Sequence, residues 1–132
     1  MDIAIVGATG NVGRKTLEVL QQKNLNIDNL YLVASQNSAG KQLEFNGKKY
    51  SIENLETYDF SKAKITFFAA GGKISEQYAE KAAKHTTVID NSSYFRMDPD
   101  VPLIVPQVNA KDIQNMKKNI IANPNCSTAQ LV

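Results

Sequence analysis

The chain has 132 residues, of which 42% are hydrophobic and 21% charged, which suits one soluble domain with a hydrophobic core. Fifteen basic and thirteen acidic residues leave a formal charge of +2, so we expect neither a nucleic-acid nor a membrane partner. The single cysteine excludes an internal disulfide and an all-cysteine metal site, and it fits a cytoplasmic location.

The first part of the chain predicts two parallel strands joined by a helix. Residues 2–6 form a short apolar run that ends at Gly7, and a second apolar run covers residues 30–34. Between them, the spacing of Val12, Thr16, Val19 and Leu20 predicts a helix. Within residues 43–52, Asn46-Gly47 separates two short alternating segments, which is typical of a two-residue hairpin turn. We interpret this hairpin as an insertion at one margin of the sheet.

The rest of the chain continues the alternation of strands and helices. Residues 65–70 predict a strand that ends at Gly71-Gly72, and a helix follows with an apolar stripe of Tyr78, Ala79, Ala82 and Ala83. Further short strands are expected at 88–90, 103–105 and 120–122, with a loop over 91–102 and a helix start at 127–132. The order predicts an α/β, doubly wound, mostly parallel Rossmann-type sheet with its ligands at the carboxyl edge.

The glycines after the first strand indicate a dinucleotide site. Gly7, Gly10 and Gly13 allow a tight turn, close approach of a pyrophosphate and its binding by helix N-terminal amides; a plain strand-to-helix turn is the alternative. Residues 32–38 contain no acid that would hold the ribose hydroxyls of NAD. We therefore predict NADP as the cofactor, with Lys41 either beside its 2′-phosphate or simply solvated.

A cysteine, an arginine and a histidine are the remaining candidates for chemistry. Cys126 follows Asn-Pro-Asn and precedes a helix-start composition, a setting that favours a thiolate, although a buried inert cysteine is the alternative. Arg96 could hold a phosphate or carboxylate, or could pair with Asp98 or Asp100 at the surface. His85 is expected at the opposite edge of the sheet and is not a candidate general base.

Several segments together resemble the aspartate-semialdehyde dehydrogenase family along the full length of the chain. They are Gly-Ala-Thr-Gly-Asn-Val-Gly at 7–13, Ser-Ala-Gly-Lys at 38–41, Asn-Ser-Ser-Tyr-Phe-Arg at 91–96, Val-Pro-Gln-Val-Asn at 105–109 and Asn-Pro-Asn-Cys-Ser-Thr at 123–128. The resemblance implies that Cys126 is the nucleophile, that Asn125 is its partner and that Arg96 binds the substrate phosphate. It also implies the cofactor contacts Gly7, Thr9, Gly10, Asn11, Val12, Gly13, Ser35, Ser38 and Gly71.

The activity that this resemblance implies is the NADP-dependent conversion of L-aspartyl 4-phosphate to L-aspartate 4-semialdehyde, an oxidoreductase step that supplies lysine, diaminopimelate, threonine and methionine biosynthesis. The Cys126 thiolate would displace phosphate to give a thioester, and hydride from NADPH would then give a thiohemiacetal that collapses to the aldehyde. Asn37 stands where bacterial members often have an arginine near the 2′-phosphate. This difference implies a weaker affinity for NADP.

We expect residues 1–132 to form one NADP-binding domain that carries the catalytic cysteine. In the family, the general-base histidine and the substrate-carboxylate arginine lie in a second catalytic and dimerisation domain, which we expect to be absent from this chain. We therefore expect this chain alone to be inactive, and the full-length protein to be a homodimer or homotetramer. The alternatives are N-acetyl-glutamyl-phosphate reductase, which typically has Pro-Gly-Cys in place of Pro-Asn-Cys, a non-catalytic nucleotide-binding paralogue, and a redox-sensing domain.

Overall fold

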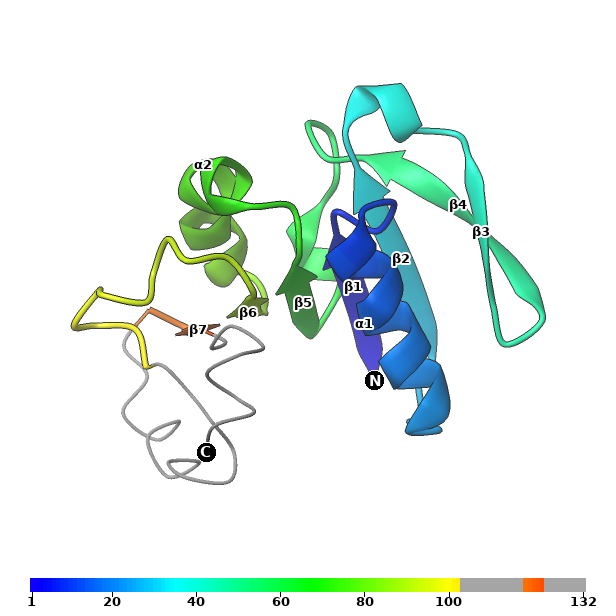
Figure 1. Ribbon diagram of the computed structural model, residues 1–132, viewed down its shortest axis with the longest axis horizontal. Coiled ribbons are helices and arrows are strands. Elements are labelled where there is room, and N and C mark those ends of the chain that lie inside the picture. Colours follow the sequence, from blue (N-terminus) through cyan, green and yellow to red (C-terminus); the bar gives the residue numbers. More distant parts are fainter. Residues whose placement is uncertain (103–117, 123–132) are drawn as a thin grey trace.

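The computed structural model describes residues 1–102 and 118–122, which form a seven-stranded sheet with two α-helices (Figure 1). The strands are β1 (Asp2–Val6), β2 (Asn29–Ala34), β3 (Gln42–Phe45), β4 (Lys48–Asn54), β5 (Ile65–Phe68), β6 (Thr87–Asp90) and β7 (Ile120–Ala122). The helices are α1 (Asn11–Gln22) and α2 (Gly72–Ala83), and short 3-10 helices are η1 (Gln36–Ser38) and η2 (Phe60–Lys62). The strand predicted at 103–105 and the helix start predicted at 127–132 lie outside the described residues.

The strands follow the order β3-β4-β2-β1-β5-β6-β7, and every neighbouring pair except β3 and β4 is parallel. From the central strand β1 the chain first moves toward β2 and later returns to β5 on the other side. Such a reversal opens a crevice at the carboxyl ends of the two diverging strands. The predicted doubly wound, mostly parallel sheet is confirmed. None of the helices among the described residues is long and apolar enough to cross a membrane.

The two faces of the sheet carry separate parts of the core. Ile3 and Ile5 of β1 share a buried cluster with Leu17 of α1, whereas the alternate residues Ala4 and Val6 share a cluster with residues of α2. Because successive side chains of a strand point to opposite faces, α1 and α2 cover opposite sides of the sheet. In Figure 1, α1 lies in front of β1 and β2, and α2 lies beside β5 and β6.

The apolar face of α1 differs from the predicted one. The residues that α1 buries are Gly13, Leu17 and Leu20, whereas Val12 and Val19 are 48% and 40% exposed. The reason is steric, since Gly13 lies against the turn after β1 and so fixes the rotation of the helix about its axis. The predicted stripe is therefore shifted by one residue, and only Leu20 of it is buried.

The predicted hairpin is confirmed at the margin of the sheet. β3 pairs antiparallel with β4, and both turn residues have positive φ, 52° at Asn46 and 79° at Gly47. A two-residue turn of this kind matches the twist of the strands that it joins. β4 also pairs in parallel with β2, so the hairpin extends the main sheet, and the residue that follows it, Leu55, reaches the carboxyl edge.

Tyr58, in the segment that connects β4 to β5, is a buried polar residue whose contribution to stability can be tested. Its side chain is 7% exposed and packs edge-on against Phe60 at 5.2 Å between ring centroids, and its hydroxyl has no hydrogen-bond partner among the described residues. Burial, followed by the negative charge of Glu53, raises the pKa of the Tyr58 phenol. Since an unpaired buried hydroxyl carries a desolvation cost, we expect Tyr58→Phe to leave the free energy of unfolding unchanged or to raise it by up to about 1 kcal/mol.

Urea denaturation of the wild-type chain and the Tyr58→Phe variant measures this difference directly. A loss of more than about 1 kcal/mol would show instead that the hydroxyl makes a hydrogen bond that the fold needs.

Candidate functional site

A cleft of about 350 Å³ lies at the carboxyl edge of the sheet, beside the turn from β1 to α1. Its lining includes the predicted cofactor residues Gly7, Thr9, Gly10 and Ser35. The remaining lining residues come from the ends of strands and from α2, and they are Val6, Ala34, Leu55, Ala69, Ala70 and Ile74. The cleft therefore lies at the switch point where a doubly wound sheet binds its ligand.

The backbone of the turn explains why two of its glycines are required. Gly7 has a φ of +86°, and a Cβ there would lie 2.8 Å from the carbonyl carbon of Ala69. A Cβ on Gly13 would lie 2.1 Å from the Gly7 carbonyl oxygen. Both contacts are with backbone, so neither neighbour can move aside by changing a rotamer. These two glycines permit the close packing of β1, β5 and α1.

Gly10 differs because its surroundings are open. It is exposed at the N-cap of α1, and a Cβ there would meet only the Gly7 oxygen, at an ordinary 3.6 Å. No side chain of the described residues caps this helix end. The free amides of the first helical turn and the open space over Gly10 therefore suit an anionic group such as a pyrophosphate. These residues fit the phosphate part of a dinucleotide.

The end of β2 provides the second wall of the cleft. Ser35 is exposed there, and the Ser38 amide donates to the Ser35 carbonyl oxygen at 2.9 Å, which folds η1 back against the strand end. The Leu55 amide donates to the Ala34 carbonyl oxygen at 2.8 Å and brings an apolar side chain to the same place. The wall combines neutral polar groups with apolar surface, as a ribose and an adenine require.

The sequence predicts the polar residues of the cleft better than its apolar ones. Ala69 and Ala70 follow β5 directly, so their position after a strand was a signal for the site. Leu55 follows the hairpin, and Ile74 lies within a helical repeat, so no local pattern distinguishes either from core. Of the predicted contacts, Gly71 is the exposed N-cap of α2, next to Ala70, while Gly13 and Ser38 support the cleft from outside its lining.

A second hollow of about 500 Å³ joins the glycine turn to the loop after β6. The predicted cofactor residues Asn11 and Val12 line it, together with Asn91, which begins that loop. Its other lining residues are Lys15, Thr16, Val19, Leu20 and Phe67. The structure thus brings Asn91, the first residue of the segment 91–96, to the same hollow as the first turn of α1, as the shared sheet edge predicts.

Arg96 is half-buried in this loop. Its Nη2 donates to the Asn91 carbonyl oxygen at 3.3 Å, and its amide donates to the Ser93 carbonyl oxygen at 3.3 Å. Asp98, a surface partner considered for Arg96, accepts a hydrogen bond from the Lys118 ammonium at 2.8 Å. That hydrogen bond, with a second from the Asp100 amide, lowers the pKa of the Asp98 carboxyl.

Cys126 and Asn125 lie outside the described residues, as does the segment 105–109. β7 pairs in parallel with β6 and places Ala122 opposite Asp90, at the same edge as the cleft. His85 is exposed before β6 begins, at the amino edge, so the prediction that it lies away from the ligand site is confirmed.

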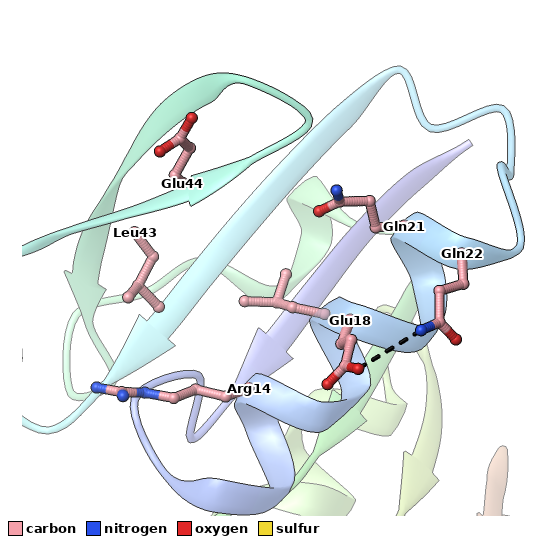
Figure 2. Close-up of a pocket in the computed structure, with 7 residues that line it drawn as sticks. Arg14, Glu18, Gln21, Gln22, Leu43 and Glu44 are labelled. Atoms are coloured by element: carbon pink, nitrogen blue, oxygen red, sulfur yellow. Dashed lines mark hydrogen bonds between the residues drawn. The ribbon is translucent and has the colours of Figure 1, made fainter.

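A third hollow of about 440 Å³ lies between α1 and the hairpin and shares no lining residue with the cleft (Figure 2). Figure 2 shows Glu18 and Gln22 joined by a hydrogen bond on α1, with Arg14 at one end and Glu44 on the hairpin. None of the predicted site residues lines it. Its mixed charges give no preference for an anionic ligand.

Residues 2–116 match the family model described as semialdehyde dehydrogenase, NAD binding domain. The chain belongs to this family. The match spans the glycine turn, the end of β2 and the loop that contains Arg96, which are the elements that form the cleft and its surroundings. Binding of a nicotinamide dinucleotide is therefore the function of this domain in the semialdehyde dehydrogenases.

Relatives of known name agree with the family. The chain is 53% identical to an aspartate-semialdehyde dehydrogenase of Aquifex aeolicus, over 98% of this chain and 39% of that protein. It is 49% identical to aspartate-semialdehyde dehydrogenase 2 of Vibrio cholerae, over 99% of this chain and 40% of that protein. The chain thus spans about two fifths of the length of these relatives.

Solved structures share the fold. The crystal structure of aspartate-semialdehyde dehydrogenase II from Vibrio cholerae complexed with ASA matches with a TM-score of 0.95 at 49% identity, over 98% of this chain and 43% of that chain. The enzyme of Candida albicans with NADP matches with a TM-score of 0.78 at 25% identity, over 100% of this chain and 45% of that chain.

Alanine substitutions of Gly10 and Gly13 separate ligand binding from folding in this semialdehyde dehydrogenase domain. We expect Gly10→Ala to change the free energy of unfolding by about 1 kcal/mol or less, because its methyl group has room. We expect it to weaken NADPH binding about tenfold, because the methyl group occupies the space over the helix N-terminus. Gly13→Ala should lower the free energy of unfolding by roughly 3 kcal/mol or more, because its methyl group meets backbone.

Urea denaturation and a fluorescence titration with NADPH measure the two effects. Equal stability of the two variants would contradict the steric role assigned to Gly13, and unchanged NADPH affinity of Gly10→Ala would contradict the phosphate site.

Proposed function

We propose that this chain is the NADP-binding portion of an aspartate-semialdehyde dehydrogenase, which converts L-aspartyl 4-phosphate to L-aspartate 4-semialdehyde in the biosynthesis of lysine, diaminopimelate, threonine and methionine. The observation that carries the proposal is the common edge of the open glycine turn and the loop that contains Arg96. The 53% identity to the Aquifex aeolicus enzyme supports the substrate. The structure of the Candida albicans enzyme with NADP supports the cofactor.

The preference for NADP rests on the end of β2. Residues 32–38 contain no acid, and Ser35 lies in the cleft wall with an exposed hydroxyl. A carboxylate at this point would hold the ribose hydroxyls of NAD and would repel a 2′-phosphate. Ser35 and Ser38 are the groups that would donate to that phosphate, and the exposed Lys41 would add a positive charge nearby. Asn37 supplies no charge there, so the affinity is expected to be modest.

The chemistry follows from a thiolate beside a phosphate-binding arginine. The Cys126 sulfur would attack the acyl carbon of aspartyl phosphate, and the carbon–oxygen bond to phosphate would break to leave a cysteine thioester. Arg96 would hold the departing phosphate, and Asn125 would position the carbonyl group that reacts. When bound, NADPH would supply the hydride that reduces the thioester to the aldehyde level. Asn91, at the start of the Arg96 loop, lines the same hollow as the predicted cofactor residues Asn11 and Val12.

Completion of turnover needs a general base that the described residues do not place at this edge. The only histidine of the sequence, His85, is exposed at the opposite edge. We infer that residues 1–132 form one domain, and that a second catalytic and dimerisation domain corresponds to the part of the relatives that this chain does not match. We further infer a homodimer or homotetramer of the full-length protein. A cytoplasmic location is supported by the single cysteine.

Cofactor preference can be tested at Ser35. We expect Ser35→Asp to weaken NADPH binding about tenfold or more, because a carboxylate would repel the 2′-phosphate. NADH binding should be unchanged or stronger. Ser35→Asn introduces a side chain of the same size as aspartate but without its charge, and this variant should bind both nucleotides like the wild-type chain. Fluorescence titrations with both nucleotides decide the matter, and an equal loss for NADPH and NADH in Ser35→Asp would contradict the assignment of the 2′-phosphate site.

The proposed nucleophile can be tested by its rate of alkylation against pH, with and without NADP. We expect an apparent Cys126 pKa well below the free value of about 8.5, and slower alkylation when NADP is bound. Arg96→Ala should raise this pKa because a nearby positive charge is lost, while Arg14→Ala, an exposed arginine of α1, should not.

A slow, pH-normal and NADP-insensitive cysteine would contradict a prepared thiolate within residues 1–132. Steady NADPH formation from the semialdehyde and phosphate by this chain, above a Cys126→Ala control, would contradict the need for a second domain.

A further inference from the structure

Asp90 is a buried acid at the carboxyl end of β6, where the strand meets the loop 91–96. Its side chain is fully buried, with 0% exposure. Its Oδ1 accepts hydrogen bonds from the Ser75 hydroxyl at 2.7 Å and from the Ser92 amide at 2.9 Å. Its Oδ2 accepts a hydrogen bond from the Ser92 hydroxyl at 2.8 Å. Burial of a carboxylate costs free energy unless hydrogen-bond donors compensate it. Here both oxygens of Asp90 have such donors.

The hydrogen bond from the Ser92 amide to Asp90 is an Asx turn, which fixes the backbone of the residue between them. That residue is Asn91, whose amide donates to the Phe68 carbonyl oxygen at 2.9 Å. Its carbonyl oxygen accepts the hydrogen bond from Arg96 Nη2. The Asx turn therefore sets the direction of the carbonyl group that holds the Arg96 guanidinium.

The same carboxylate oxygen also accepts a hydrogen bond from α2, a helix that borders the nucleotide cleft. Ser75 lies in the first part of α2, and its amide donates to the carbonyl oxygen of the N-cap residue Gly71 at 3.2 Å. The preceding residue, Ile74, lines the cleft. One oxygen atom of Asp90 thus fastens the Arg96 loop to the helix that borders the cofactor site.

We propose that Asp90 is a positioning residue that holds the Arg96 loop in the geometry needed to bind the substrate phosphate, and that Ser75 and Ser92 hold Asp90 in turn. This inference rests on the proposed function, because it takes Arg96 as the phosphate ligand. Tyr94 and Phe95 pack edge-on at 4.7 Å, and Phe95 is 1% exposed, so apolar packing anchors the loop. Packing has little directional preference, whereas the hydrogen bonds to Asp90 determine where the Asn91 carbonyl group points.

The test is a titration of the chain with inorganic phosphate, in the presence of NADP, followed by the ¹⁵N chemical shifts of the backbone amides of residues 91–96, which Arg96→Ala retains. Asp90→Ala removes both carboxylate oxygens, and with them the acceptor of the Asx turn. We expect it to weaken phosphate binding about tenfold, because a guanidinium displaced by a fraction of an ångström loses its paired contacts. NADPH affinity should stay within about twofold of the wild-type value, because the glycine turn is unchanged.

Thr66→Val is the matched control. Thr66 is fully buried, and its hydroxyl is 3.0 Å from the Thr86 hydroxyl, so the substitution also removes a buried hydrogen bond between neighbouring segments. A merely structural role of Asp90 would lower the thermal midpoint in both variants and leave phosphate affinity unchanged in both. Asp90→Asn retains an oxygen that can accept from the Ser92 amide, so it should keep the Asx turn and bind phosphate within about twofold of the wild-type chain. If Asp90→Ala does not fold, Asp90→Glu takes its place, because its longer side chain keeps the charge but not the geometry of the Asx turn.

The outcomes separate this inference from the proposed function. Weaker phosphate binding in Arg96→Ala and in Asp90→Ala (or Asp90→Glu), but not in Asp90→Asn or Thr66→Val, is the expected result. Weaker binding in Arg96→Ala alone would overturn the role of Asp90 and leave the proposed function intact. If the wild-type chain and Arg96→Ala respond to phosphate alike, Arg96 is not the phosphate ligand, and both proposals fall.

Discussion

The approach of Gly13 to the Gly7 carbonyl oxygen is the contact on which the architecture of the site depends. Any side chain at Gly13 would begin 2.1 Å from that oxygen. The contact brings α1 directly onto the end of β1, turns Leu17 toward the sheet and leaves the amides of the first helical turn at the mouth of the cleft. The same rotation leaves Val12 and Val19 partly exposed in the hollow that they share with Phe67 of β5, so this apolar flank of α1 follows from the packing of the turn.

Topology then gathers residues that are distant in sequence. The chain first adds strands on one side of β1 and then crosses to the other side. As a result, the ends of β1, β2, β4 and β5 all contribute to one cleft. The loop after β6 joins them through Asn91, and the register of β6 with β7 returns the chain to the same edge at Ala122. The cleft and the start of the loop that contains Arg96 therefore share one edge of the sheet because of its topology.

Local patterns were sufficient for the strands among the described residues, the hairpin and the glycine turn, because periodicity and turn chemistry act over a few residues. They were insufficient where a side chain acts across the fold. The rotation of α1 depends on contact with Gly7, the apolar wall depends on Leu55 after the hairpin, and the partners of Asp90 lie on two different elements. Cys126 and Asn125 remain predictions, since they lie outside the described residues.

Two buried polar groups show how differently the fold treats its core and its site. The Tyr58 ring packs against the rings of Tyr31 and Phe60, and its buried hydroxyl has no hydrogen-bond partner in the described part of the chain, so a phenylalanine would fill nearly the same space. Asp90 receives donors on both oxygens, from a helix and from a loop. An apolar residue at Asp90 would leave those donors unpaired and the loop free to turn. The hydrogen bonds of Asp90 thus specify the conformation of the Arg96 loop, which the packing of Phe95 alone would leave undetermined.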